Sequence, residues 1–252
     1  MATREYQTDL LIIGGGLAGT FAAIKARDAG VENLLLVDKA TVGRSGCSTF
    51  AAGVITAWFP WDNLDDWIRE TVEHGEYLND QEWLDVLYTQ GYPRILDLEA
   101  WGVELVRNEK GEIARALGRG QLGHKALRNI MFHGPQFMET MRQQVVKRRI
   151  PMEQRVMVTD LLTRDNRVVG AVGFNPRTGD QYTFRARTTI LAAGANVFKS
   201  ISIGHRNITG DAHGMAFRAG ARHTCFEFGT QNVSLRNFDT AGLNMFVGTG
   251  AR

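Results

Sequence analysis

The hydrophobic pattern at the start of the chain predicts a strand, a helix and a second strand. Asp9–Ile13 is an apolar run of the length of a buried strand, and Leu17–Ala29 then follows a helical pattern that Gly30 ends. A second apolar run, Asn33–Val37, predicts another buried strand, and Asp38 stands at its end. Strands that alternate with helices in this way are typical of an α/β fold with a parallel sheet.

The middle of the chain has the pattern of helices. Residues 64–101 read as mainly helical, and Pro93 predicts a kink or a break between two helices there. Pro135 is placed to begin a further helix that runs to about Arg149. The apolar positions of the first stretch favour core packing over a stacking platform for a ligand. They are Trp67, Trp83, Leu84, Leu87, Ile95, Leu98 and Trp101.

The pattern changes to β-structure in the second half of the chain. Arg155–Leu162, Val168–Phe174 and Gln181–Arg187 are predicted strands joined by polar turns, and together they predict a β-meander. Thr189–Leu191 is predicted to be a separate buried strand that runs into Ala-Ala-Gly at residues 192–194. This strand-to-glycine ending resembles the end of the first predicted strand.

A glycine-rich turn joins the first predicted strand to the first helix. Gly14, Gly16 and Gly19 have the spacing G-x-G-x-x-G. In this spacing the first glycine permits a tight turn, the second lets the backbone approach a pyrophosphate, and the third allows close helix–strand packing. Asp38 is placed to accept a hydrogen bond from a ribose hydroxyl. The chain is therefore predicted to bind a dinucleotide; the alternative is a turn of another α/β protein with Asp38 as a strand-end charge.

Composition and charge exclude several other classes of protein. The chain has 252 residues and a formal net charge of +2, which favours neither nucleic acid nor an anionic membrane. It has no apolar run of transmembrane length and no signal-peptide core, so a cytoplasmic protein is expected. Its two cysteines, Cys47 and Cys225, are too few for a four-thiolate iron–sulfur cluster. Its six histidines show no metal-ligand spacing, so no metal site is expected.

Two further segments favour a flavin over a nicotinamide dinucleotide. The loop Arg44–Gly53 is rich in glycine and small hydroxyl residues, which let backbone and Oγ atoms reach a pyrophosphate and lie against a flat ring. A β-meander precedes the second strand-to-glycine turn, whereas a simple NAD-binding half continues with further βα units. A plain polar loop at residues 44–53 and a NAD-binding module remain the alternatives.

In their order along the chain, these motifs resemble the succinate dehydrogenase/fumarate reductase-type flavoproteins, a family with L-aspartate oxidase and the adenylylsulfate reductase α subunit. The resemblance is carried by GGGLAG, RSGCSTFAAG, TTILAAG and NITGDAHGMAFRAGA, within about residues 8–228. It implies an α/β fold with a Rossmann-like FAD-binding domain of the glutathione-reductase type and a β-meander over residues 1–224. Residues 225–252 would then begin a capping domain.

The resemblance also implies which residues bind FAD. The glycine turn would hold the pyrophosphate, Asp38 the adenosine ribose, and Lys39 with the 44–53 loop the ribityl-phosphate and isoalloxazine. Asp211 is a further expected contact, and its alternative, compatible role is the N-cap of a helix at about residues 212–219. The expected cofactor-binding residues are Gly14, Gly15, Gly16, Leu17, Ala18, Gly19, Asp38, Lys39, Arg44, Ser45, Gly46, Ser48, Thr49, Ala51, Ala52, Gly53, Ala193, Gly194 and Asp211.

Departures from the family pattern bear on the chemistry. Ser48 stands where members with covalently bound FAD carry a histidine, so non-covalent FAD is expected. Asn232 stands near a histidine of the dicarboxylate-processing members, and an amide supplies no positive charge to a carboxylate. The segment VVGAVGFN and the Arg236 region look closer to the adenylylsulfate reductase α subunit. Arg236 and His124 are the candidate catalytic residues; a solvated arginine and a plain surface loop are the alternatives.

The resemblance implies an FAD-dependent oxidoreductase subunit that transfers electrons through flavin N5 to or from a small anionic substrate. The electrons would pass to an iron–sulfur partner subunit, to oxygen or to a soluble acceptor, and a partner would hold the chain at the cytoplasmic face of a membrane. Because family members are longer, with their shuttle arginine beyond Arg252, an N-terminal part of such a protein is expected. The alternatives are a non-catalytic FAD-binding module and an adenylylsulfate reductase-like α subunit.

Overall fold

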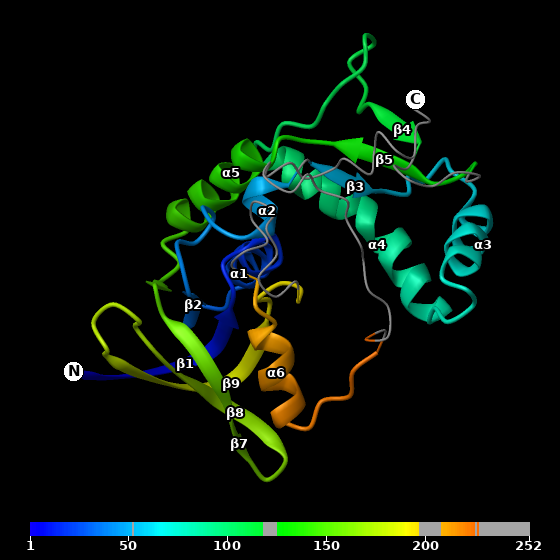
Figure 1. Cartoon of the computed structure of the whole chain (residues 1–252). Helices are drawn as coiled ribbons and strands as arrows, with labels where there is room; N and C mark the ends of the chain where they lie inside the picture. Colours follow the sequence, from blue (N-terminus) through cyan, green and yellow to red (C-terminus); the bar gives the residue numbers. More distant parts are fainter. Residues whose placement is uncertain (52, 118–124, 197–207, 225, 227–252) are drawn as a thin grey trace, which may run out of the picture. The chain divides into compact units, whose positions relative to one another are not determined.

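The computed structural model describes residues 1–51, 53–117, 125–196, 208–224 and 226 (Figure 1). These residues fall into two compact units. The first unit comprises residues 1–51 and the described residues from 138 onward, and the second comprises the described residues from 53 to 137. Nearly all residues of the expected capping domain lie outside the described ranges, so a domain boundary at residue 225 stays a prediction.

A six-stranded sheet forms the centre of the first unit. Its strand order is β6–β2–β1–β9–β8–β7, in which β6, β2, β1 and β9 are parallel while β8 and β7 are antiparallel to their neighbours. The strands are β1 (Thr3–Ile13), β2 (Leu34–Asp38), β6 (Met152–Gln154), β7 (Met157–Arg164), β8 (Arg167–Phe174) and β9 (Gln181–Leu191). The helices that flank them in sequence are α1 (Leu17–Asp28), α5 (Gly134–Lys147) and α6 (Asp211–Arg218). The predicted α/β fold with a β-meander is confirmed.

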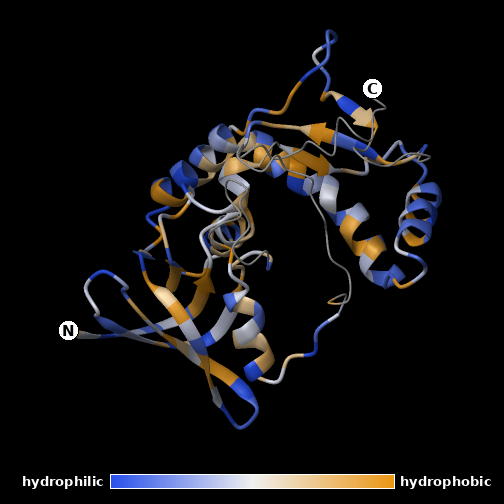
Figure 2. Cartoon of the chain, in the orientation of Figure 1, coloured by the Kyte–Doolittle hydropathy of each residue, from blue (hydrophilic) through white to orange (hydrophobic). Residues whose placement is uncertain are grey.

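The two strands beside the glycine turn are buried on both faces where they pair. These paired segments are Leu10–Ile13 of β1 and Leu34–Val37 of β2. Burial on both faces is the reason why each appears in the sequence as an unbroken apolar run, and Figure 2 shows them as hydrophobic. Phe184 of β9 and Met215 of α6 pack in the same core cluster as residues of both strands.

β9 is one continuous strand where the sequence pattern predicted two. It pairs with β8 along its first half and with β1 along its whole length. Thr189–Leu191 is therefore the end of the meander's last strand, and it is partly buried rather than buried. β1 likewise begins at Thr3 rather than at Asp9, because pairing with β9 provides backbone hydrogen bonds to residues that no apolar pattern marks.

The second unit contains a three-stranded antiparallel sheet and two helices. The sheet, which the sequence pattern did not predict, has the order β3 (Val54–Thr56), β5 (Arg128–Met131), β4 (Arg115–Leu117). The helices α3 (Leu64–His74) and α4 (Gln81–Ala100) confirm the predicted helical stretch. No helix in the described ranges of the chain is both long enough and apolar enough to cross a membrane.

The break between α3 and α4 does not lie at Pro93, which stays inside α4. The chain leaves the helical path at Glu76 and Tyr77, whose φ angles are 52° and 64°. Asp80 then caps α4, with its Oδ1 accepting two backbone N–H groups of the first turn at 3.1 and 3.3 Å. A cap satisfies free N–H groups and so sets a boundary, whereas the donor missing at Pro93 is tolerated within a 20-residue helix.

α4 buries one stripe of its surface and leaves a neighbouring apolar stripe exposed. Leu84, Tyr88 and Ile95 are buried. Trp83 and Leu87, which the sequence placed in the core, are 74% and 61% exposed, so that prediction was wrong for both. Each precedes a buried residue by one position, which turns it about 100° around the helix axis and away from the packed face.

Candidate functional site

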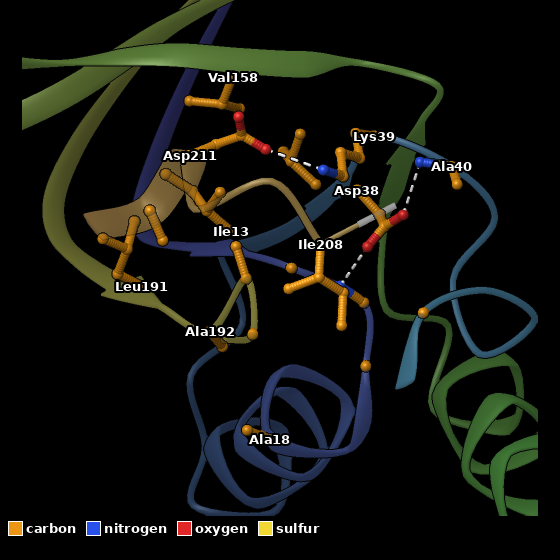
Figure 3. Close-up of a pocket in the computed structure, with 18 of the residues that line it drawn as sticks. Ile13, Ala18, Asp38, Lys39, Ala40, Val158, Leu191, Ala192, Ile208 and Asp211 are labelled. Atoms are coloured by element: carbon orange, nitrogen blue, oxygen red, sulfur yellow. Dashed lines mark hydrogen bonds and ion pairs between the residues drawn. The ribbon is translucent and has the colours of Figure 1, made fainter. Parts of the chain in front are cut away.

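A pocket of about 390 Å³ lies at the carboxyl ends of β1, β2 and β9 in the first unit (Figure 3). Open α/β sheets bind their ligands outside the carboxyl ends of the strands, and small-molecule pockets commonly measure about 300–1,000 Å³. The pocket wall is built from the glycine turn, the end of β2, the loop entering α2 (Cys47–Phe50), the end of β9, the start of β7 and α6. All of these segments belong to the first unit.

Gly14 and Gly19 are required by the packing of the protein itself. Gly14 has a φ angle of +114°, and a Cβ there would overlap the Ala192 carbonyl just beyond β9. A Cβ on Gly19 would overlap the Gly14 carbonyl, so α1 can start this close to the turn only because Gly19 has no side chain. These are the tight turn and the close helix–strand packing expected of the first and third glycines of the motif.

Gly16 differs from them, because the surrounding protein would accept a side chain there. Its backbone is extended, with φ −78° and ψ −165°, and a Cβ would meet only Ser48 Oγ at 3.6 Å, an ordinary contact. Leu17 and Ala18, the first residues of α1, line the pocket, and the Leu17 N–H donates to Ser48 Oγ at 3.3 Å. The open space beside Gly16, at a helix N-terminus, fits a phosphate group.

Asp38 links the end of β2 to the glycine turn. Its Oδ2 accepts the Gly15 N–H at 2.6 Å and its Oδ1 accepts the Ala40 N–H at 2.6 Å (Figure 3). Asp38 also lines the pocket. A carboxylate oxygen has more than one lone pair, so both oxygens can still accept a hydrogen bond from a ribose hydroxyl. The geometry therefore fits a dinucleotide with its pyrophosphate at Gly16 and a ribose at Asp38.

Lys39 and Asp211 form an ion pair at the edge of this pocket. Lys39 Nζ lies 2.8 Å from Asp211 Oδ2 (Figure 3). It also lies 3.0 Å from Thr209 Oγ1, and the Thr209 hydroxyl donates to Asp211 Oδ2 at 2.6 Å. Burial acts to raise the pKa of Asp211, but the hydrogen bonds from Lys39 and Thr209 outweigh it and hold that pKa below its usual value. Asp211 is thus a carboxylate at neutral pH.

Asp211 is not the cap of α6, contrary to the alternative role expected for it. Gly210, with a φ angle of +73°, is the N-cap, and Asp211 is the first residue of the helix. No side chain caps α6 at Gly210. The Asp211 carboxylate instead bonds with Lys39, which lies 172 positions earlier in the chain. A local sequence pattern cannot reveal a partner at that separation.

The remaining expected contacts divide between the pocket and other partners. The Arg44 guanidinium is paired with Glu139, with Nε 3.1 Å from Oε2, and the Thr49 hydroxyl donates to the Ser45 carbonyl at 3.2 Å. Gly53 belongs to the second unit, where its carbonyl accepts the Phe132 N–H at 3.0 Å. The expected residues that do line the pocket are Gly14, Gly15, Gly16, Leu17, Ala18, Asp38, Lys39, Ser45, Gly46, Ser48, Ala193, Gly194 and Asp211.

Several expected positions have no place in the described pocket. Ala51 is described but does not line it. Ala52 and the candidate catalytic residues His124 and Arg236 lie outside the described residues. Their roles, and those of Arg44, Thr49 and Gly53, therefore stay predictions.

Motif reasoning missed two parts of the pocket wall. One part is the start of β7, with the residue before it, and the other is the pocket-facing side of α6. Both were missed because a plain strand and a short amphipathic helix carry no ligand signature.

Cys47 also lines the pocket, and burial raises the pKa of its thiol, so it is not a thiolate at neutral pH. Within the described ranges, no group of three or more metal-ligating side chains is assembled. The lining residues outside the expected set are Ile13, Val37, Ala40, Cys47, Val156, Met157, Val158, Leu191, Ala192, Ile208, Ala212, His213, Met215 and Ala216.

Comparisons with known proteins agree with this geometry. A family model described as an FAD binding domain matches residues 9–234. An uncharacterized FAD-dependent oxidoreductase of Methanocaldococcus jannaschii is 32% identical over 228 residues, which are 85% of this chain and 40% of that protein. A fumarate reductase (CoM/CoB) subunit of Methanothermobacter marburgensis is 31% identical over 230 residues, 88% of this chain and 41% of that protein.

Solved structures show the same relationship. A variant of E. coli quinol fumarate reductase superimposes with a TM-score of 0.76 and 29% identity, covering 86% of this chain and 37% of that one.

Further relatives were found by sequence. An adenylylsulfate reductase α subunit, L-aspartate oxidases and succinate dehydrogenase flavoprotein subunits are 28–30% identical to this chain. The chain spans about 40% of the length of the relatives it matches. It belongs to the FAD-binding domain family of the succinate dehydrogenase and fumarate reductase flavoproteins.

Proposed function

We propose that this chain is the FAD-binding part of an oxidoreductase flavoprotein and that it holds FAD without a covalent bond. The observation that carries the proposal is the open space beside Gly16, at the start of α1, in a pocket that also contains Asp38. Ser48, in place of a histidine, supports non-covalent binding. On this proposal residues 1–224 form the FAD-binding domain and residues 225–252 begin a capping domain.

The chain's own groups then have distinct tasks. The amides at the start of α1 bind the pyrophosphate, and Asp38 accepts a hydrogen bond from the adenosine ribose. Ser45, Gly46 and Ser48, with residues 193–194, wrap the ribityl and isoalloxazine end. Lys39 brings a positive charge to the pocket, and Asp211 fixes its position through the ion pair. Bound FAD supplies hydride or electron transfer at its N5 atom, while the protein orients the ring.

The reaction we propose is electron transfer between this flavin and a small anionic substrate, with an iron–sulfur protein as the partner subunit. Relatives are named as one subunit of a fumarate reductase and as the flavoprotein subunit of succinate dehydrogenase, which supports a role inside a complex. Such a partner would place the chain at the cytoplasmic face of a membrane. His124 and Arg236 are the candidates for contact with the substrate.

A second candidate function is a non-catalytic FAD-binding module. It is favoured by the observation that the chain spans only about 40% of its relatives. A stopped-flow screen of the FAD-loaded chain with fumarate, succinate, aspartate, and sulfite plus AMP separates the candidates. Reoxidation or reduction of the bound flavin by a dicarboxylate supports the proposed reaction. A change in the flavin with sulfite plus AMP alone supports an adenylylsulfate reductase-like subunit. No response from any substrate favours the non-catalytic module.

FAD binding itself is tested by filling the space beside Gly16. Gly16→Ala is expected to change the thermal unfolding temperature little, because the backbone there is extended and a Cβ meets only an ordinary contact, but to weaken FAD binding at least tenfold. The measurement is a titration of FAD fluorescence. Gly91→Ala is the matched control, since a Cβ on Gly91, in the second unit, meets nothing within 4 Å. Equal FAD affinity in Gly16→Ala and the unsubstituted chain would contradict the proposed site.

A further inference from the structure

One pocket residue, His213, has no task in the assignments above. It lies on α6, two positions after Asp211, and among the described pocket-lining residues it carries the only ring. α6 packs on β7, and Met215 and Val158 are buried in the same core cluster. Both residues also line the pocket. This part of the wall therefore combines apolar side chains with a single flat polar ring, which suits a flat heterocycle with hydrogen-bonding edges.

The His213 ring is supported by neighbours that do not line the pocket. The Phe226 ring lies edge-on to it, with centroids 5.3 Å apart, and the His223 ring lies 6.3 Å away. α6 is tied to β7 by Arg218, whose Nε donates to Asp160 Oδ1 at 2.8 Å. His213 Nδ1 is buried and has no hydrogen-bond partner among the described residues. Because this nitrogen is buried, a ligand in the open pocket would meet other atoms of the His213 ring.

The order of contacts along the pocket shows which part of a dinucleotide reaches His213. The Gly15 N–H donates a hydrogen bond to Asp38 at 2.6 Å. Lys39, the residue after Asp38, bonds to Asp211 at 2.8 Å. Asp211 lies two positions before His213 on α6. Figure 3 shows Asp211 at the opposite end of the view from Ala18, which lies at the start of α1. A nucleotide with its pyrophosphate at the glycine turn and its ribose at Asp38 therefore directs its base toward α6.

We propose that His213 is a specificity-determining residue for the adenine half of FAD: its ring contacts the base and distinguishes cofactors that carry an adenylate from those that do not. This inference rests on the proposed FAD site. Aromatic side chains bind bases through their flat faces whatever the base, and the imidazole adds a hydrogen-bonding nitrogen, Nε2, that a phenyl ring lacks. His213 thus contributes both contact area and polar complementarity at the adenine end.

The test measures the affinities of FAD, ADP and FMN for the 252-residue chain by isothermal titration calorimetry. His213→Ala is expected to weaken FAD and ADP binding roughly tenfold, the size of effect typical of losing one base-stacking side chain, and to leave FMN unchanged. His213→Phe keeps a ring and is expected to restore part of the loss. Phe174→Ala is the control, because Phe174 is an aromatic residue of the same unit that is 39% exposed and lies outside the pocket wall.

The outcomes separate this inference from the proposed function. Unchanged FAD and ADP affinities in His213→Ala would overturn the role of His213 while leaving the FAD site intact. An equal loss of FMN affinity, or a matching loss in Phe174→Ala, would show a general effect on the fold and also overturn the role of His213. If the unsubstituted chain bound neither FAD nor ADP, the proposed function itself would fail and the inference with it. Thermal unfolding of each variant is recorded alongside.

Discussion

At the scale of single residues, the ion pair between Lys39 and Asp211 couples the stability of the first unit to pH. The pKa of Asp211 is lower in the folded chain than its usual value of about 3.9. A carboxyl group with a lowered folded pKa stabilises the fold above its unfolded pKa, and this contribution is lost as the pH falls through the folded pKa. Stability from this pair is therefore fully present at neutral pH and disappears in acid.

Asp211→Asn is expected to lower the free energy of unfolding at pH 7 by on the order of 1 kcal/mol, since it removes one partly exposed charge-assisted pair. The difference from the unsubstituted chain should shrink as the pH drops below about 3.9. Urea unfolding at a series of pH values measures this. Asp160→Asn serves as the control, because Asp160 and its partner Arg218 are both half exposed. A difference that stayed constant with pH would rule out the ionised pair as its source.

The three motif glycines show that one sequence signature can combine two physical demands. Any side chain at Gly14 or Gly19 would overlap the protein's own backbone, whereas the space beside Gly16 is open. The sequence predicted these different roles from the motif. Only the positions of neighbouring atoms, such as those of the Ala192 carbonyl, show which glycines the fold needs and which one has open space beside it.

At the scale of elements, α3 anchors the segment that leads into β5 in the second unit. Glu70 of α3 is 8% exposed, and its carboxylate accepts backbone N–H groups from Lys125, Ala126 and Leu127 at distances of 2.7–3.2 Å. Both carboxylate oxygens are used. A buried acceptor that satisfies several amides in this way fixes the backbone of that segment against the helix.

Glu70→Gln is expected to destabilise the second unit by about 1–3 kcal/mol, because the amide NH₂ group would face backbone N–H donors and leave them unsatisfied. Chemical denaturation followed by tryptophan fluorescence reports this, since Trp67 is buried on the same helix. Glu73→Gln, at an exposed position of α3, is the matched control and should change stability little. Equal stabilities of the two variants would contradict the anchoring role.

Elements were predicted best where one local signal was enough. The turn after β1, the α1 helix and the Pro135 start of α5 follow from glycine spacing, helical period and the fixed φ of proline. Pro93 was predicted to mark a kink or a break between two helices, but the break precedes α4, where Asp80 caps the helix, and Pro93 lies inside it. β9 was divided in two, since its continuity comes from pairing with β1.

At the scale of the whole molecule, the described pocket belongs to the first unit alone. FAD at 100 times its dissociation constant is expected to stabilise that unit by about 2.7 kcal/mol. Hydrogen exchange should then slow at the glycine turn, at the end of β2 and in α6. The helix α4 serves as an internal reference for the second unit. Protection confined to α4, with none at the turn, would contradict the placement of FAD in this pocket.

The sequence by itself determined the α/β fold, the glycine turn, the position of Asp38 and the FAD-binding family, because each depends on local patterns and on the order of these patterns along the chain. The tertiary structure alone decided that Lys39 is the partner of Asp211, that β9 is one strand, and that His213 joins the pocket wall. These features arise from contacts between segments that are far apart in sequence. Local periodicity and spacing carry no record of such contacts, so only the folded chain reveals them.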